Sequence, residues 1–196
     1  MARLSAAVSS VALVLLPAAA GFLSGSLPFS AWLARLRGRD VRSVGDGNPG
    51  AINAFKAAGP LVGSAALLLD FLKGALPVAA AWWLLGLRGW LILPAAIAPV
   101  LGHAFSPFLG FRGGKAVAVT FGVWSGITLW QGPCLLGAVF LLGKFVFRLR
   151  DARTVLLGTA ALLAAAVLWW REPALTALAA ANAAVLGWKH RRELGL

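Results

Sequence analysis

One stretch of this strongly apolar chain, residues 25–59, is rich in glycine, asparagine and arginine. A loop within it combines closely spaced glycines with amide and basic side chains, namely Gly45, Gly47, Gly50, Asn48, Asn53, Arg42 and Lys56. Glycine has no Cβ, so such a loop can adopt positive φ and bring backbone N–H groups and cations close to an anion. The spacing matches neither the Walker nor the Rossmann pattern, so the loop alone only indicates phosphate binding. A plain tight turn is the alternative.

A second segment with the same ingredients is FRGGK, residues 111–115. Gly113 and Gly114 free the backbone, and Lys115 stands where we expect the next helix to begin, which is an arrangement that binds anions. Arg112 adds a second cation. Two cationic, glycine-rich turns are therefore the candidate phosphate sites, although Lys115 and Arg112 would also suit membrane anchors on the cytoplasmic side.

Three ionisable residues lie within or at the ends of apolar segments. Asp70 and Lys73 are three residues apart, so they share one face of a helix. Charges at membrane depth are costly and usually face partners, water or substrate, so this pair either orders the neighbouring loops or is only a buried ion pair. His103, near the end of another apolar segment, is either a general base or a donor to a nearby group.

Composition places the chain among integral membrane proteins. Its 196 residues are 60% hydrophobic and 12% charged, and the mean hydropathy is +0.85, so we expect one all-α membrane domain over residues 1–196. A net charge of +12 would suggest nucleic acid in a soluble protein. On this apolar background it indicates the positive-inside rule, with anionic lipid or an anionic substrate as partner. Cys134, the single cysteine, excludes an internal disulfide and a cysteine metal cluster.

The apolar segments predict seven transmembrane helices. They cover about 4–30, 60–85 and 90–105, two spans within 116–143 that turn at residues 131–133, then 154–170 and 173–188. Pro17 and Pro28 are expected to kink the first. The start of the chain, with Arg3 and the apolar run 8–16, also resembles a signal peptide, but one continuous first helix is the simpler interpretation.

The distribution of Lys and Arg sets the orientation. With seven spans, one side of the membrane receives all but three of the 18 Lys and Arg residues; the exceptions are Arg3, Arg88 and Arg171. By the positive-inside rule the loaded side is cytoplasmic, so the N-terminus is outside and the C-terminus inside. Both glycine segments, the Asp70 and Lys73 pair and His103 are then expected on the cytoplasmic side.

At this point the sequence resembles the PlsY family of bacterial membrane acyltransferases. The similarity extends over essentially the whole chain, through GSLPF at Gly25, the run from Ala34 to Gly59, LDFLKGALP at Leu69, LGHAFSPFLGFRGGKAVA at Leu101 and KHRRE at Lys189. The resemblance implies a seven-helix inner-membrane protein with a cytoplasmic active site and neither metal nor cofactor. It implies transfer of an acyl group from acyl phosphate to glycerol 3-phosphate, which gives lysophosphatidic acid and phosphate, and no nucleic-acid partner.

The same resemblance, with the residue chemistry above, gives the expected site. We expect Lys115, His103 and Asn53 to be catalytic. Substrate is expected to contact Ser26, Gly45, Asp46, Gly47, Asn48, Gly50, Lys56, Asp70, Lys73, Arg112, Gly113, Gly114, Thr159 and His190. In this family the acceptor's own phosphate is thought to help deprotonate the attacking hydroxyl, so no protein base is strictly required. The tail from His190 to Arg192 would also suit a simple basic terminus.

Several positions depart from the family pattern. VGSGN reads VGDGN here, so Asp46 places a carboxylate in the proposed phosphate cradle, and Asp46→Ser is expected to raise activity. Other changed positions are Ile52, Lys56, Ala116, Leu156, Thr159 and Glu193. They leave an alternative open, in which the chain is a divergent, weakly active or inactive relative that binds or transports a phosphorylated solute. Pro17, Pro28 and Pro77 would break helices as in transporters, but the chain lacks two similar halves.

Overall fold

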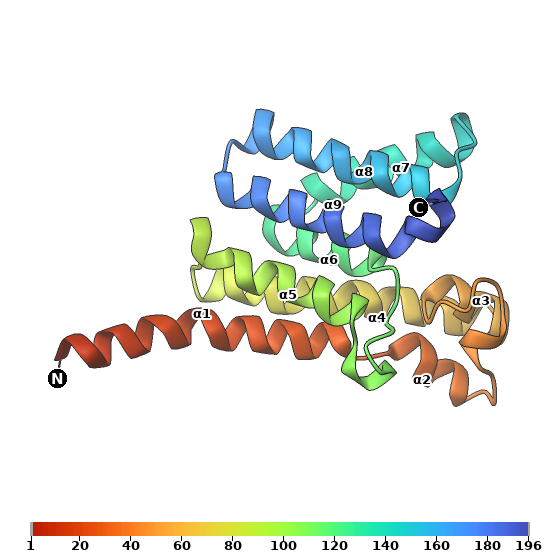
Figure 1. Ribbon diagram of the computed structural model, residues 1–196, viewed down its shortest axis with the longest axis horizontal. Helices are drawn as coiled ribbons and strands as arrows, with labels where there is room; N and C mark the ends of the chain where they lie inside the picture. The colour runs from red at the N-terminus through yellow and green to blue at the C-terminus, as the bar shows by residue number, and fades with distance from the viewer. Residues whose placement is uncertain (1, 196) are drawn as a thin grey trace.

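The computed structural model describes residues 2–195, and from residue 11 onward their side chains. The described elements are all helical (Figure 1). They are α1 (Ala2–Ser26), α2 (Phe29–Arg35), η1 (Val41–Ser43), α3 (Ala51–Ala58), α4 (Pro60–Ala79), η2 (Ala80–Leu84), η3 (Gly89–Leu91), α5 (Ile92–Ala104), η4 (Pro107–Leu109), α6 (Val117–Thr128), α7 (Gln131–Leu141), η5 (Leu142–Val146), α8 (Asp151–Ala165), η6 (Ala166–Trp170) and α9 (Pro173–Leu194).

Four helical segments are long and apolar enough to cross a membrane, namely Val11–Arg35, Pro60–Leu84, Gly89–Leu109 and Asp151–Trp170. Three of them confirm the helices predicted near 60–85, 90–105 and 154–170. Two shorter apolar helices, Val117–Thr128 and Gln131–Val146, occupy the region where two further spans were predicted. The turn between them lies earlier than predicted, because Leu129 reverses the chain with φ of 56° and α7 already begins at Gln131.

The first span, predicted over 4–30 with kinks at Pro17 and Pro28, is interrupted at Pro28, whereas Pro17 lies inside α1. α1 ends at Ser26, and α2 begins at Phe29 after a break at Pro28. Proline has no N–H and clashes with the preceding turn, so the break is expected physically at this residue. The Nζ of Lys73, on α4, donates to the carbonyl of Leu27 across 2.8 Å, so a distant side chain satisfies a carbonyl at the break.

Two short helices were not predicted, α2 and α3, both within the glycine-rich stretch 25–59. They are only 7 and 8 residues long and depend on packing against α4. A small apolar cluster, Ala31, Ala34, Val41, Ala51, Ala54, Val62 and Ala66, is buried between α2, α3 and the start of α4. The glycine loop therefore connects α2 and α3, two short helices that both pack against α4.

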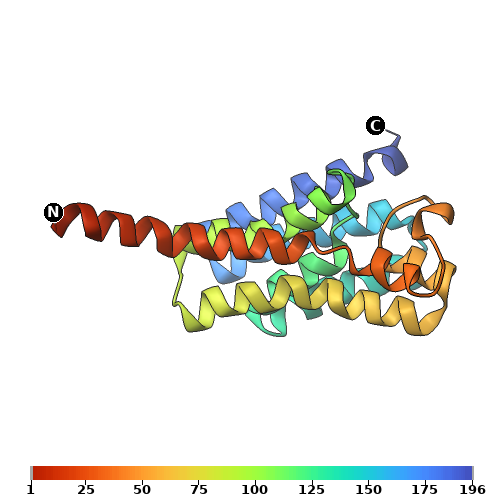
Figure 2. The same ribbon diagram turned by 90° about the horizontal axis from the view of Figure 1, so that it is seen from below.

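The main helices run side by side, and glycines let several backbones approach closely (Figure 2). A Cβ at Gly25 would overlap Pro99 where α1 meets α5, and one at Gly122 would overlap Phe71 where α6 meets α4. Figure 1 shows the loop before α3, the segment between α5 and α6, and the C-terminal end of α9 at the end of the bundle away from the N-terminus.

Candidate active site

The first glycine loop closes around Asp46. Gly45 and Gly47 have φ of 59° and 70°, a conformation that favours glycine. The carboxylate of Asp46 accepts a hydrogen bond from the N–H of Asn48 at 3.2 Å and from Nδ2 of Asn53 at 2.9 Å. Asn53 also donates to the carbonyl of Asn48 at 2.9 Å. Asn53 is buried in the first turn of α3, so it anchors the exposed loop to a helix.

Gly45 is glycine for a second reason. A Cβ there would overlap Oδ1 of Asn53 and lie 3.2 Å from Nζ of Lys56. Lys56 is exposed on α3, so its ammonium lies beside the loop backbone in contact with solvent. The loop, the Asn53 amide and this cation therefore form one compact surface, and their binding of phosphate stays a prediction. Gly50, at the other end of the loop, is the N-cap of α3.

Lys115 joins the two glycine segments. Its Nζ lies 2.5 Å from Oδ2 of Asp46 and also pairs with the carboxylate of Glu193 at the end of α9. Partial burial would raise the pKa of Asp46, but hydrogen bonds from Lys115, Asn48 and Asn53 outweigh it and lower that pKa to about 2. Burial would lower the pKa of Lys115, but its bonds to both carboxylates raise it instead. Asp46 and Lys115 are therefore both charged near neutral pH.

The second glycine segment packs on the end of α5. The N–H of Gly114 donates to the carbonyl of His103 at 3.0 Å. A Cβ at Gly113 would overlap that carbonyl, and one at Gly114 would overlap Nε2 of the His103 ring. These two glycines thus allow the segment to approach the end of α5 closely. The residue in the left-handed region is Ala116, with φ of 64°. Helix α6 begins only at Val117, two residues after Lys115.

Two arginines differ in what they contact. A guanidinium nitrogen of Arg42 lies 3.5 Å from the carbonyls of Leu109 and Arg112, so it links η1 to the turn before the second glycine segment. Arg112 is exposed, and among the described residues its side chain has no hydrogen-bond or ion-pair partner. The guanidinium of Arg112, three residues before Lys115, is therefore available to an anion. The guanidinium of Arg42 already contacts backbone carbonyls.

Asp70 and Lys73 lie in the middle of α4, and both are buried. Their charged groups are 2.7 Å apart. Ser30 donates to Asp70 at 3.2 Å, and Ser24 donates to the carbonyl of Lys73 at 2.9 Å. The buried Nδ1 of His103 lies 3.9 Å from Asp70. This cluster connects α1, α2, α4 and α5 directly beneath the second glycine segment.

Three other predicted site residues use their polar atoms within their own helices. Ser26 donates to the carbonyl of Phe22 at 2.7 Å, and Thr159 donates to that of Leu156 at 2.9 Å. Nδ1 of His190 lies 2.8 Å from the carbonyl of Leu186. All three are buried. The structure therefore groups them with the helix core rather than with the exposed cations, and their contact with substrate stays a prediction.

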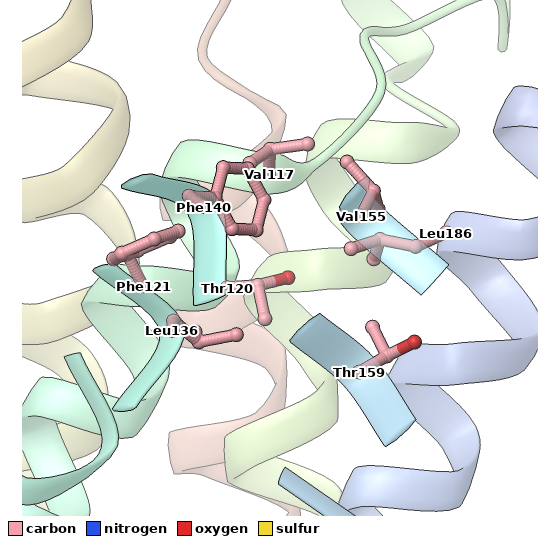
Figure 3. A pocket seen from close by; sticks show the side chains of 8 residues that line it. All are labelled: Val117, Thr120, Phe121, Leu136, Phe140, Val155, Thr159 and Leu186. Atoms are coloured by element: carbon pink, nitrogen blue, oxygen red, sulfur yellow. The ribbon is translucent and has the colours of Figure 1, made fainter. Parts of the chain in front are cut away.

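Thr159 lines a small apolar pocket between α6, α7, α8 and α9 (Figure 3). Its walls are Val117, Thr120, Phe121, Leu136, Phe140, Val155, Thr159 and Leu186. Val117 is the first residue of α6 and lies two residues beyond Lys115 along the chain. The pocket has room for little more than one water molecule, so it holds no acyl chain in this conformation.

The predicted site left out two residues of this junction, although Glu193 was noted as a departure from the family pattern. Lys189 donates to the carbonyls of Ala104 and Gly113, and Glu193 pairs with Lys115. They are four residues apart on α9, a spacing that puts them on one helix face and was the available signal. Among the described residues, no group of three His, Cys, Asp or Glu side chains lies close enough to hold a metal ion.

Comparisons with known proteins identify the family of the chain. The profile of the glycerol-3-phosphate acyltransferase family matches residues 15–195. Glycerol-3-phosphate acyltransferase 1 of Thermotoga maritima is 43% identical over 188 residues, which cover 88% of this chain and 92% of the relative. The crystal structure of PlsY, an integral membrane glycerol 3-phosphate acyltransferase, in its glycerol 3-phosphate form has a TM-score of 0.84 and 30% identity, with 95% of this chain and 90% of that chain covered.

The lysophosphatidic acid form of PlsY gives a TM-score of 0.82 and 29% identity, with 93% and 90% covered. Sequence and structure thus match over nearly the full length. The chain belongs to the glycerol-3-phosphate acyltransferase family.

Proposed function

We propose that this membrane enzyme transfers an acyl group from acyl phosphate to glycerol 3-phosphate and releases lysophosphatidic acid and phosphate. Acylation of glycerol 3-phosphate is the activity of the family to which the chain belongs. The observation that carries the choice of a phosphorylated donor is the position of Lys115, where two glycine segments meet. A donor and an acceptor that both carry phosphate suit a site with two cationic turns.

Phosphate binding would replace the internal ion pairs of Lys115. The carboxylates of Asp46 and Glu193 are the anions that hold its ammonium, so they stand where phosphoryl oxygens would be attracted. Lys56, exposed beside Gly45, supplies a second cation for the same loop. We assign Asn53 and Asn48 to holding the loop in shape, because Asn53 already bonds both Asp46 and the Asn48 backbone.

The transfer itself needs orientation and charge neutralisation more than a protein nucleophile, since phosphate is a good leaving group. The acceptor's hydroxyl oxygen bonds to the acyl carbonyl carbon, and the bond from that carbon to the phosphate oxygen breaks. Phosphate leaves with the bonding electrons, next to Lys115. The hydroxyl proton passes to a phosphate oxygen. His103, buried beneath Gly114, would support the loop from below rather than take the proton.

An acyl chain would enter the apolar pocket of Figure 3 only after its walls move apart, because the pocket has room for little more than one water molecule. Thr159 would then contact the chain through its methyl group, since its hydroxyl bonds Leu156. Asp70 and Lys73 would contribute indirectly, because they fix the helices below the site.

We infer further that seven helices cross a bacterial inner membrane, with the N-terminus outside and the site facing the cytoplasm. The positive-inside rule supports this orientation. The arrangement in Figure 1 agrees with it, because both glycine segments and the C-terminal turns of α9 lie on the side of the bundle opposite the N-terminus. The transporter alternative is not favoured, because the relatives named above are acyltransferases.

The test is phosphate release by the purified protein in lipid vesicles that contain an acyl phosphate, with glycerol 3-phosphate added outside. We expect release, with stoichiometric lysophosphatidic acid, and at least about a hundredfold loss in Lys115→Ala. Matched vesicles receive an acyl thioester as donor. Wild-type protein that uses the thioester and ignores acyl phosphate would overturn the proposed donor, and equal rates for wild type and Lys115→Ala would overturn the proposed site.

A further inference from the structure

The end of α9 contacts the second glycine segment through the partly buried side chain of Lys189. Nζ of Lys189 donates to the carbonyl of Ala104 at 2.9 Å and to that of Gly113 at 2.8 Å. The same ammonium lies 5.5 Å from the centre of the Phe105 ring. One side chain thus ties the last residue of α5 to the residue that begins the Gly113–Gly114 turn.

These carbonyls need a donor. Ala104 is the last residue of α5, and the final carbonyls of a helix have no partner within it. The N–H of Gly114 satisfies His103, and Lys189 satisfies Ala104. Lys189 also binds the carbonyl of Gly113, so it does more than cap α5. It fixes the segment of backbone that leads to Lys115 two residues later.

Glu193 adds a second contact from the same helix. It lies one turn beyond Lys189 on α9, on the same face, and pairs with Lys115 itself. The last turns of α9 therefore hold the segment twice, once by its backbone at Gly113 and once by the side chain of Lys115. Arg192, between them in sequence, is exposed, and its side chain has no hydrogen-bond or ion-pair partner among residues 11–195.

We propose that Lys189 is a positioning residue for acyl transfer, which sets the height of Lys115 over the first glycine loop by binding the carbonyl of Gly113. This proposal rests on the proposed function, in which Lys115 binds phosphate. Without the contact, the backbone of Gly113 and Gly114 keeps the bond from the N–H of Gly114 to His103, and the segment is otherwise held at its ends, by Arg42 at the Arg112 carbonyl and by the ion pairs of Lys115. Displacing a catalytic cation by about 1 Å can cost up to about a hundredfold in rate.

The first test is independent of catalysis. Hydrogen exchange is measured on the peptide covering residues 106–116 in detergent-solubilised wild type, Lys189→Met and the matched control Arg192→Met, which also removes one positive charge. We expect faster exchange in Lys189→Met alone, and partial restoration in Lys189→Arg. Equal exchange in wild type and Lys189→Met overturns the proposal.

The second test is a double-mutant cycle on kcat/KM with Lys115→Ala. We expect Lys189→Met to lower kcat/KM by about tenfold to a hundredfold in the wild-type background and to change it little when Lys115 is already alanine. A general loss of stability would lower both backgrounds equally, and that result overturns the positioning role. An inactive wild type would overturn the proposed function, while the exchange experiment would still decide whether Lys189 holds the segment.

Discussion

The carboxylate of Asp46 lies 2.5 Å from the ammonium of Lys115, and 69 residues separate them along the chain. The residue that departs from the family pattern in the first glycine loop is thus bonded to the central lysine of the second. The sequence interpretation treated Asp46 as an uncompensated negative charge. In the structure Lys115 compensates it, so the expected repulsion of substrate becomes competition for Lys115.

Replacing Asp46 tests this competition. Asp46→Ser should lower the KM for the phosphorylated substrates by up to about fivefold, because an exposed ion pair is worth up to about 1 kcal/mol and the substrate no longer has to displace it. Asp151→Ser, which breaks the exposed ion pair with Lys144 and leaves Lys115 paired, is the control. Steady-state kinetics in vesicles give the answer, and an unchanged KM would mean that Asp46 does not compete with phosphate.

The same pair sets a pH dependence. Folding lowers the pKa of Asp46 from 3.8 to about 2, so its stabilising effect is complete above pH 3.8 and is lost as the pH falls towards 2. The pKa of Lys115 is raised, so its effect persists up to its ordinary value of 10.5 and is lost above it. The difference in melting temperature between wild type and Asp46→Asn should be constant from about pH 5 to 9 and shrink below about pH 4. A difference that changes around pH 6 would contradict these assignments.

The buried pair in α4 should matter through stability. Lys73→Met leaves the Asp70 carboxylate and the Leu27 carbonyl without their donor, and we expect a loss of about 3–5 kcal/mol. Asp70→Leu combined with Lys73→Met should cost less than the single change, because no unpaired charge remains. Thermal unfolding in detergent compares the variants. If the single variant is as stable as wild type but inactive, the pair acts on substrate directly.

Substitutions of Thr159 distinguish a role of its hydroxyl group in substrate binding from a role of its methyl group in packing. Thr159→Val keeps the shape and removes a hydroxyl that already bonds Leu156, so the KM for glycerol 3-phosphate should not change. Thr159→Phe overfills the pocket of Figure 3, which has room for little more than one water molecule, and should lower stability by about 1–3 kcal/mol in chemical unfolding. A raised KM for glycerol 3-phosphate in Thr159→Val would instead place the hydroxyl on the substrate.

Ala116 carries backbone strain that glycine would relieve. Its φ of 64° costs an alanine about 1–2 kcal/mol, so Ala116→Gly should raise stability by up to about 1 kcal/mol after loss of its buried methyl group. Ala118→Gly, within α6, should lower stability by about the same amount. Chemical unfolding distinguishes the two, and a destabilised Ala116→Gly would show that packing of the methyl outweighs the strain.

The sequence predicted the long helices well, because apolar runs such as 60–85 are strong signals. It missed α2 and α3, whose helical state depends on packing against α4, and it placed the turn before α7 too late because Leu129 carries no turn signal. The meeting of the two glycine segments was predicted from topology. The link through Asp46 was not, since an ion pair between residues far apart leaves no local pattern, and Lys189 looked like part of a basic tail.

The break at Pro28 has a consequence for how the protein assembles. The lysine that satisfies the Leu27 carbonyl enters the membrane 46 residues later. Lipid offers no donor for an open carbonyl. The first hydrophobic segment therefore reaches its final bent form only after α4 has been inserted beside it. Until Lys73 is in place, this segment must remain unbent, lie near the membrane surface, or be covered by another protein.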